Sequence, residues 1–397
     1  MSRLKNSKFT AFFASQYFLL LLLASAFFTY FALNRGGVNI FIEIGGLFLV
    51  LYFFLGVYPL KEISLALWIA AAICTYLILT SLMIAPQHPH LRWMKNLMRM
   101  LVVVFMIHCL AQKKIENWVF TALAALLALV VCWQFIAHNL LNMPYGTFSN
   151  KHYLATFAVL AFPALIYFVL TAPGWYRLFF LAICLIDAHL FLQIGSRTAY
   201  AGILFGGAFA ICFLIKGRSR WIGLFLLGIA SVIIYLTNYS YVVTRIKRLI
   251  LNFTADERFD LWSKAWLKLQ DNSLIDWIFG HGMGWFSITY TGRRRSELIF
   301  PHGHFLEIIY QNGLVGLIMI YGGLICLIVS AIIAMKRAHD RKVRFLLISL
   351  TVALFTWIIH SGLAFPIYSK NSLYPLAFIL GPLLVLVGKE NRRDSST

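Results

Sequence analysis

The stretch that decides the fold of this chain reads GLVGLIMIYGGLICLIVSAIIAM and runs from Gly313 to Met335. It contains no charged residue, and it exceeds the length of about 20 residues that a helix needs to cross a bilayer. The basic residues Lys336 and Arg337 follow it directly, and a polar segment that contains His302 precedes it. This pattern is typical of a membrane span with a positively charged flank in the cytoplasm.

Similar apolar runs recur along the whole chain of 397 residues. Only 12% of the residues are charged and 61% are hydrophobic, whereas a soluble globular domain carries about 25% charged residues. The composition therefore excludes a soluble fold and predicts an all-α polytopic membrane protein. We expect about twelve spans, at residues 9–33, 38–58, 63–85, 97–112, 116–137, 152–172, 175–194, 198–216, 220–237, 313–335, 343–363 and 372–388.

The basic residues of the short connections set the expected orientation. If the N-terminus is cytoplasmic, the loop after every second span carries Lys or Arg, as short cytoplasmic loops do. These residues, with those of the two ends, are Arg3, Lys5, Lys8, Lys61, Lys113, Lys114, Arg177, Lys216, Arg218, Arg220, Lys336, Arg337, Arg341, Lys342, Arg344, Lys389, Arg392 and Arg393. We therefore expect both termini in the cytoplasm.

One long hydrophilic segment, residues 238–312, then lies outside, between the ninth and tenth spans, and a shorter polar loop is expected at 86–96. Within the long segment, apolar residues between Asp256 and Gln270 recur at helical spacing and predict an amphipathic helix on the membrane surface. The glycine-rich stretch Phe279–Phe286 lacks the context of a nucleotide-binding loop and is interpreted as a structural turn. We interpret residues 1–397 as a single transmembrane domain.

The net charge of +20 would suggest nucleic acid as the partner of a soluble protein. Here the cytoplasmic loops explain part of that charge. The remaining basic residues lie in the outer segment and indicate an anionic ligand; they are Arg245, Lys247, Arg248, Arg258, Arg293, Arg294 and Arg295.

Two arginines are candidates for holding that anion. Arg197 lies in the turn Gly195-Ser196-Arg197-Thr198 between the seventh and eighth spans, where a guanidinium either extends to the membrane surface or binds phosphate bidentately. The helix that starts beside Ser196 would add free N–H groups to an anion site. Arg258 opens the amphipathic helix, where its charge opposes the helix dipole, so a ligand contact explains it better.

The segment Pro301-His302-Gly303-His304 is the candidate for the reacting group. Two histidines do not make a metal site, and the six cysteines lack metal-site spacing, so we expect no metal. A neutral His302 near arginines is a competent general base near neutral pH. Asn150, Lys151 and His152, at the outer start of the sixth span, are either interfacial residues or a further part of the site.

These features, in this order and on this topology, resemble the O-antigen ligase family and its wider superfamily, which includes O-antigen polymerases. The family signature is a His, usually a polar residue, nine residues, a Gly, two residues and a small residue or Tyr. His302, Gly303, Gly313 and Gly316 occupy these places. Gly303 departs from the usual polar residue, which makes His304 a candidate substitute for its hydrogen bond.

Family ligases also carry arginines in positions that Arg197 and Arg258 match. The resemblance implies an inverting, metal-independent glycosyltransferase of lipopolysaccharide synthesis in the bacterial inner membrane, without a cofactor and with its site facing the periplasm. It implies transfer of a glycan from undecaprenyl pyrophosphate to a sugar of the lipid A core. Catalysis would then rest on His302 as base, and on Arg197 and Arg258, which bind the pyrophosphate. The residues expected to support them are Ser196, Asn150, Lys151, His152 and His304.

Three other functions remain open at this point. A protein O-glycosyltransferase of the same superfamily is the weakest of them, since such chains often carry an additional soluble region that this sequence lacks. A glycan polymerase of the same superfamily would use a second lipid-linked chain as acceptor, but polymerases more often have two prominent periplasmic loops. A lipid or glycan transporter would need ionisable residues near the midplane of the membrane. The only residues of that kind worth naming are Asp187, His189 and His360.

Overall fold

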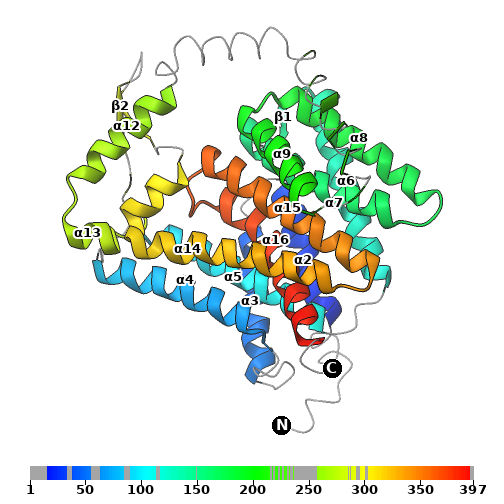
Figure 1. Cartoon of the computed structure of the whole chain (residues 1–397), viewed down its shortest axis with the longest axis horizontal. Coiled ribbons are helices and arrows are strands. Elements are labelled where there is room, and N and C mark those ends of the chain that lie inside the picture. The colour runs from blue at the N-terminus through cyan, green and yellow to red at the C-terminus, as the bar shows by residue number, and fades with distance from the viewer. Residues whose placement is uncertain are drawn as a thin grey trace.

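A computed structural model of the chain describes residues 16–33, 38–54, 63–84, 90–112, 117–148, 150–214, 257–284, 286, 288–291, 296–299 and 303–393, with isolated positions between 217 and 236. This part of the chain is almost entirely helical (Figure 1). Its strands are short: β1 (Pro144–Thr147), and a ribbon in which β2 (Ile288–Thr291) runs antiparallel to β3 (Ser296–Ile299). The predicted helical membrane class is confirmed.

The described helices coincide with predicted spans. Seven are long and apolar enough to cross a membrane: α4 (Leu65–Ile84), α5 (His90–Gln112), α7 (Lys151–Thr171), α8 (Tyr176–Ile194), α14 (His304–Arg337), α15 (Arg341–Ala364) and α16 (Lys370–Arg393). Shorter apolar stretches of 10–17 residues lie in four further helices: α2 (Gln16–Phe31), α3 (Val38–Phe54), α6 (Asn117–Asn139) and α9 (Arg197–Phe209), which continues as a π-helical turn, η3 (Ala210–Leu214). The ninth predicted span, 220–237, is described only at isolated positions, so the count of twelve stays a prediction.

One predicted boundary is wrong. The segment 86–96 is not all loop, because α5 begins at His90, and Asn96 of this helix is buried and donates a hydrogen bond to the Tyr368 carbonyl (3.1 Å). Residues 304–312, before the tenth predicted span, are helical as well, and a break at Gly313 separates them from that span. In both cases contacts with other helices stabilise a polar helical segment that hydrophobicity along the chain does not reveal.

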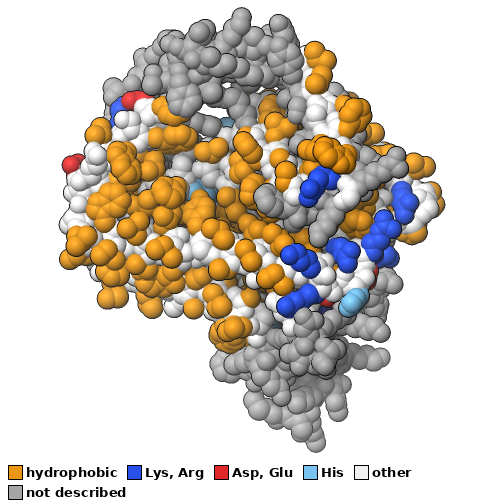
Figure 2. Space-filling view, in the orientation of Figure 1, with side chains coloured by type: hydrophobic (Ala, Val, Ile, Leu, Met, Phe, Trp, Pro, Cys, Tyr) orange, Lys and Arg blue, Asp and Glu red, His pale blue; other side chains and the backbone are white. Residues whose placement is uncertain are grey.

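Two helices at the periphery present an apolar face to the outside. Hydrophobic side chains cover the front of the molecule, where α4 and α14 lie side by side (Figures 1 and 2). Leu65 on α4 and Ile318 on α14 are 74% and 69% exposed. By contrast, α15 lies inside the bundle and packs against α7, α9, α14 and α16. Such a distribution suits a bundle whose solvent is hydrocarbon, because lipid tails cover the apolar outer face.

The predicted amphipathic helix is confirmed as α12 (Glu257–Gln270). Its buried residues Leu261, Ala265 and Leu269 recur every fourth position and so form one face. That face packs into a small apolar cluster with Phe286 and with Tyr310 of α14. The helix is therefore anchored to the start of α14, together with the short helix α13 (Leu274–Phe279) that follows it.

The segment that contains α12 and α13 contacts α14 where Gly313 interrupts that helix. Gly313 has φ 65° and ψ −170°, which interrupts the helix. Just before the break, the carbonyls of Tyr310 and Gln311 accept hydrogen bonds from the backbone of the glycine-rich stretch, from His281 (2.9 Å) and Gly282 (2.8 Å). The segment 280–284 is thus a structural turn, as predicted, and it supplies the partners that backbone groups in a membrane protein require.

We expect Gly313→Ala to destabilise the protein. The new Cβ would lie 2.1 Å from the Ile278 carbonyl oxygen, and the left-handed φ costs a residue with a side chain about 1–2 kcal/mol. The thermal midpoint of the purified protein in detergent should fall by several degrees. Gly322→Ala, in the same helix with no atom within 4 Å of its Cβ, is the matched control and should leave the midpoint unchanged. Equal midpoints for both variants would contradict this account.

Candidate active site

The three predicted catalytic residues are described to different extents. His302 lies outside the described residues, although Gly303 and His304 directly after it are described. Arg197 is the first residue of α9 and Arg258 the second of α12, and only their backbones are described. The site can therefore be built from the segments that carry these residues, and their roles stay predictions.

The turn that carries Arg197 is formed by its neighbours. Gly195 ends α8 in the left-handed conformation (φ 61°), and Ser196 is the extended residue before α9. Ser196 is buried, and its hydroxyl lies 3.3 Å from Thr198 Oγ1 and 3.4 Å from His152 Nδ1 of α7. The structure thus brings together Ser196 and His152, two of the predicted supporting residues, beside Arg197.

Asn150 and Lys151 precede His152. The Asn150 side chain accepts a hydrogen bond from the His152 backbone N–H (2.9 Å) and so caps α7. This contact fixes the start of the helix that presents His152 to Ser196. Asn150 therefore has a local structural task, while Lys151 is partly exposed at the same helix start.

His360 of α15 joins this group, although the sequence suggested it only as a midplane transport residue. It is fully buried, with Nδ1 3.0 Å from Thr198 Oγ1 and Nε2 3.0 Å from Thr156 Oγ1. Both ring nitrogens are thus engaged with hydroxyls of α9 and α7. No local sequence signal could have found this bridge, because its three residues are more than 40 positions apart from one another.

A second polar group lies at the start of α14. Glu307 is buried; it accepts hydrogen bonds from the Ile367 backbone N–H (2.9 Å) and from Gln311 (3.1 Å). Tyr368 donates a hydrogen bond to the Asn312 side chain. These contacts clamp the start of α14 to residues 365–369, the α15–α16 loop. Glu307 was not predicted from the sequence, where its one signal is a lone carboxylate beside a long apolar run.

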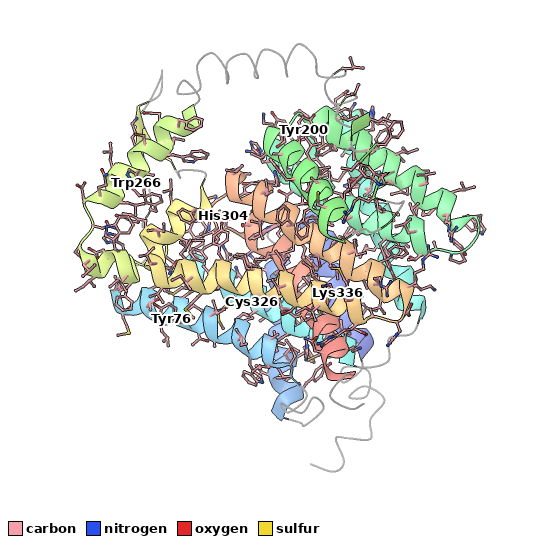
Figure 3. All side chains as sticks on the ribbon, in the orientation of Figure 1. Tyr76, Tyr200, Trp266, His304, Cys326 and Lys336 are labelled. Carbon is pink, nitrogen blue, oxygen red and sulfur yellow. The ribbon has the colours of Figure 1, made fainter. Side chains whose placement is uncertain are left out.

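His304 lies between the two groups. It is buried and hydrogen-bonds to the Phe365 backbone, and its Nε2 has no partner among the described residues. The Phe365 ring lies 6.3 Å from the His152 ring and 6.1 Å from the His360 ring, between centroids. In Figure 3, His304 lies between α12, marked by Trp266, and α9, marked by Tyr200. The α15–α16 loop therefore links the turn of Arg197 to the segment that follows His302.

Gly303 has a structural reason to be glycine. A Cβ at this position would lie 3.1 Å from Nε1 of Trp262, so the indole covers the place of the usual polar residue of the signature. Trp262 follows Arg258 by one helical turn and lies on the same side of α12. The segments that carry Arg258 and His302 therefore meet at this contact. The replacement of its hydrogen bond by His304 stays a prediction.

Two titratable groups between α12 and α14 are perturbed by burial. Burial lowers the pKa of His281, against the opposing effect of Asp276, and its Nε2 lies 2.9 Å from the Asn272 side-chain oxygen. Burial also lowers the pKa of Lys268. In the described part of the chain, no three His, Cys, Asp or Glu side chains gather closely enough to hold a metal ion. Metal independence stays a prediction.

Comparison with known proteins supports the resemblance inferred from the sequence. Residues 178–321 match a family model described as O-antigen ligase. The match begins in α8 and ends in α14, and it includes the turn of Arg197, the helix of Arg258, His302 and the kink at Gly313. No curated protein matches the chain. The chain is a membrane protein whose segment 178–321 is similar to the O-antigen ligase family.

Proposed function

We propose that this protein is an O-antigen ligase of the bacterial inner membrane. It transfers a glycan from undecaprenyl pyrophosphate to a sugar of the lipid A core, on the periplasmic side, without a metal or other cofactor. The observation that carries the proposal is the convergence on the α15–α16 loop. The turn of Arg197 reaches this loop through His360 and His152, and the segment after His302 reaches it through His304 and Glu307.

The convergence favours an anionic ligand. The first residues of α14 and α16 adjoin this loop, and the starts of α7 and α9 lie near it through His152 and His360, whose rings face Phe365. Each helix start carries the positive end of a dipole. With Arg197 and Arg258 added, such a place suits the two phosphates of a lipid-linked donor, and guanidinium groups keep their charge at every physiological pH.

The proposed chemistry is a single displacement. His302 takes the proton from the acceptor hydroxyl while its oxygen attacks the anomeric carbon. The new carbon–oxygen bond forms as the bond to pyrophosphate breaks on the opposite face, so the configuration inverts. Pyrophosphate leaves with the electron pair, still attached to its lipid, and Arg197 and Arg258 stabilise the charge that develops on it.

The positions of the basic residues support the proposed orientation. Lys and Arg side chains gather over the junction of α14 and α15, where Lys336 is labelled in Figure 3 (Figure 2). His360 follows Arg341 by 19 residues of α15, which is a distance of about 29 Å along a helix. This distance is close to the hydrocarbon thickness of about 30 Å. With the basic junction in the cytoplasm, the site faces the periplasm.

A glycan polymerase is the alternative, since the superfamily includes both activities. Deletion of the gene distinguishes them. We expect lipid A–core without O-antigen, together with accumulated lipid-linked polymer, and full recovery with the wild-type gene. Lipid A–core that carries single repeat units would instead identify a polymerase. Normal lipopolysaccharide after deletion would contradict both.

The roles of His302 and Arg197 are separable in the purified enzyme. We expect His302→Ala to lower single-turnover transfer by about 10²–10⁴-fold, the usual contribution of a general base, and to leave donor affinity intact. Arg197→Ala should weaken donor binding itself. His339→Ala and Arg341→Ala, at the opposite end of the bundle, are matched controls without effect. Loss of donor binding in His302→Ala with normal binding in Arg197→Ala would reverse the assignment.

We expect His360 to position the turn of Arg197. Thr198→Val and His360→Ala each remove the contact between these two side chains and leave a buried polar group unpaired, which costs about 1–3 kcal/mol. Each should raise the KM for the donor about tenfold, with little change in kcat. Because the two changes share this contact, the effect of the double variant should be smaller than the sum of the two single effects. Thr351→Val, buried on the same helix and bonded only to its own helix turn (2.7 Å to Leu347 O), is the control. Additive losses would show that the contact does not couple the residues.

A further inference from the structure

An apolar groove runs along the outside of the bundle between α4, α14 and α16. Its volume is 760 Å³, which is near the upper end of the range for small-molecule sites, about 300–1,000 Å³. Ile73 on α4 and Cys326 and Gly323 on α14 line its middle. Figure 3 marks Cys326 midway along α14. Neither the sequence features nor the proposed catalytic residues account for this groove.

The groove is long. Along α16 its lining extends from Leu373 to Asn391, which corresponds to about 27 Å at the helical rise of 1.5 Å per residue. This length approaches the hydrocarbon thickness of about 30 Å. Ser64 and Asn391 mark the end toward the chain terminus, and the lining between the two ends is almost entirely apolar. A linear hydrocarbon chain fits such a shape, whereas a compact ligand does not.

The side of the groove is open to lipid. Ile69 and Ile318 line it from opposite walls and are 51% and 69% exposed. A chain dissolved in the bilayer therefore has a lateral route into the groove. It would not have to pass through the interior of the bundle.

The outer end of the groove reaches the candidate active site. Trp357, Ile367 and Tyr368 line that end. The Ile367 N–H donates to Glu307, and the Trp357 ring lies 5.9 Å from the His304 ring between centroids. A chain lying in the groove would thus have its outer end beside the start of α14, two residues after His302.

We propose that this groove binds the isoprenoid chain of the lipid-linked donor and so sets the depth at which its pyrophosphate meets the site. The inference rests on the proposed function for the identity of that lipid. A linear chain with an anionic head fits the length and apolar lining of the groove and the helix starts at its outer end.

Direct binding is measured with photoreactive undecaprenyl phosphate and the purified full-length protein. We expect cross-links in α4, α14 and α16. Gly323→Phe should remove most of them, because the new side chain enters the groove toward Ile73, whose Cδ1 lies 3.4 Å from a Cβ at this position. Gly322→Phe is the matched control: its Cβ has no neighbour within 4 Å and it does not line the groove. Cys326→Trp fills the groove at another lining position and serves as an independent test if Gly323→Phe does not fold. Cross-links confined to other helices would overturn the proposal.

Donor chain length supplies the second readout. With undecaprenyl donor, Gly323→Phe and Cys326→Trp should raise the KM at least tenfold, whereas with a short-chain isoprenyl donor they should match the wild type. Equal effects on both donors would overturn the groove as the chain site. If the cross-links map to the groove but the wild type transfers nothing to lipid A–core, the groove is confirmed as the binding site of the isoprenoid chain and the proposed ligase function is wrong.

Discussion

The rest of the structure depends on the need of backbone polar groups for partners at the edge of a membrane. Gly313 breaks α14, and the turn at 280–284 donates two backbone hydrogen bonds to the carbonyls just before the break. Without those bonds, buried carbonyls would stay unpaired, which is costly where water is scarce. Because the turn follows α13 and α12 directly, the same contact places the helix of Arg258 above the segment that follows His302.

Buried polar side chains likewise find their hydrogen-bond partners on neighbouring helices and loops. Glu307 takes its partners from the α15–α16 loop and from its own helix, and His360 takes one hydroxyl from α7 and one from α9. Each of these groups would be expensive to bury alone. Paired in this way, they hold four helix starts and one loop in a defined arrangement, which is what a site for a doubly charged donor requires.

The histidines of this region divide into different tasks. His360 and His152 lie in the polar network beside the Arg197 turn, whereas His281 belongs to the loop that rests on α14. His360, which the sequence suggested as a midplane transport residue, has both ring nitrogens beside threonine hydroxyls. In the proposed mechanism, only His302 moves a proton, and the groove along α4, α14 and α16 brings the lipid to it.

Local patterns were sufficient to predict the helical membrane class, most helix positions, the amphipathic helix α12 and the turn at 280–284. These features depend on hydrophobicity and glycine placement over short stretches, which the sequence determines by itself. The starts of α5 and α14, the roles of Glu307 and His360, and the contact of Trp262 with Gly303 were decided only by tertiary structure. Each joins residues that are remote in the chain, and no periodicity along one helix specifies which neighbour will receive a buried polar group.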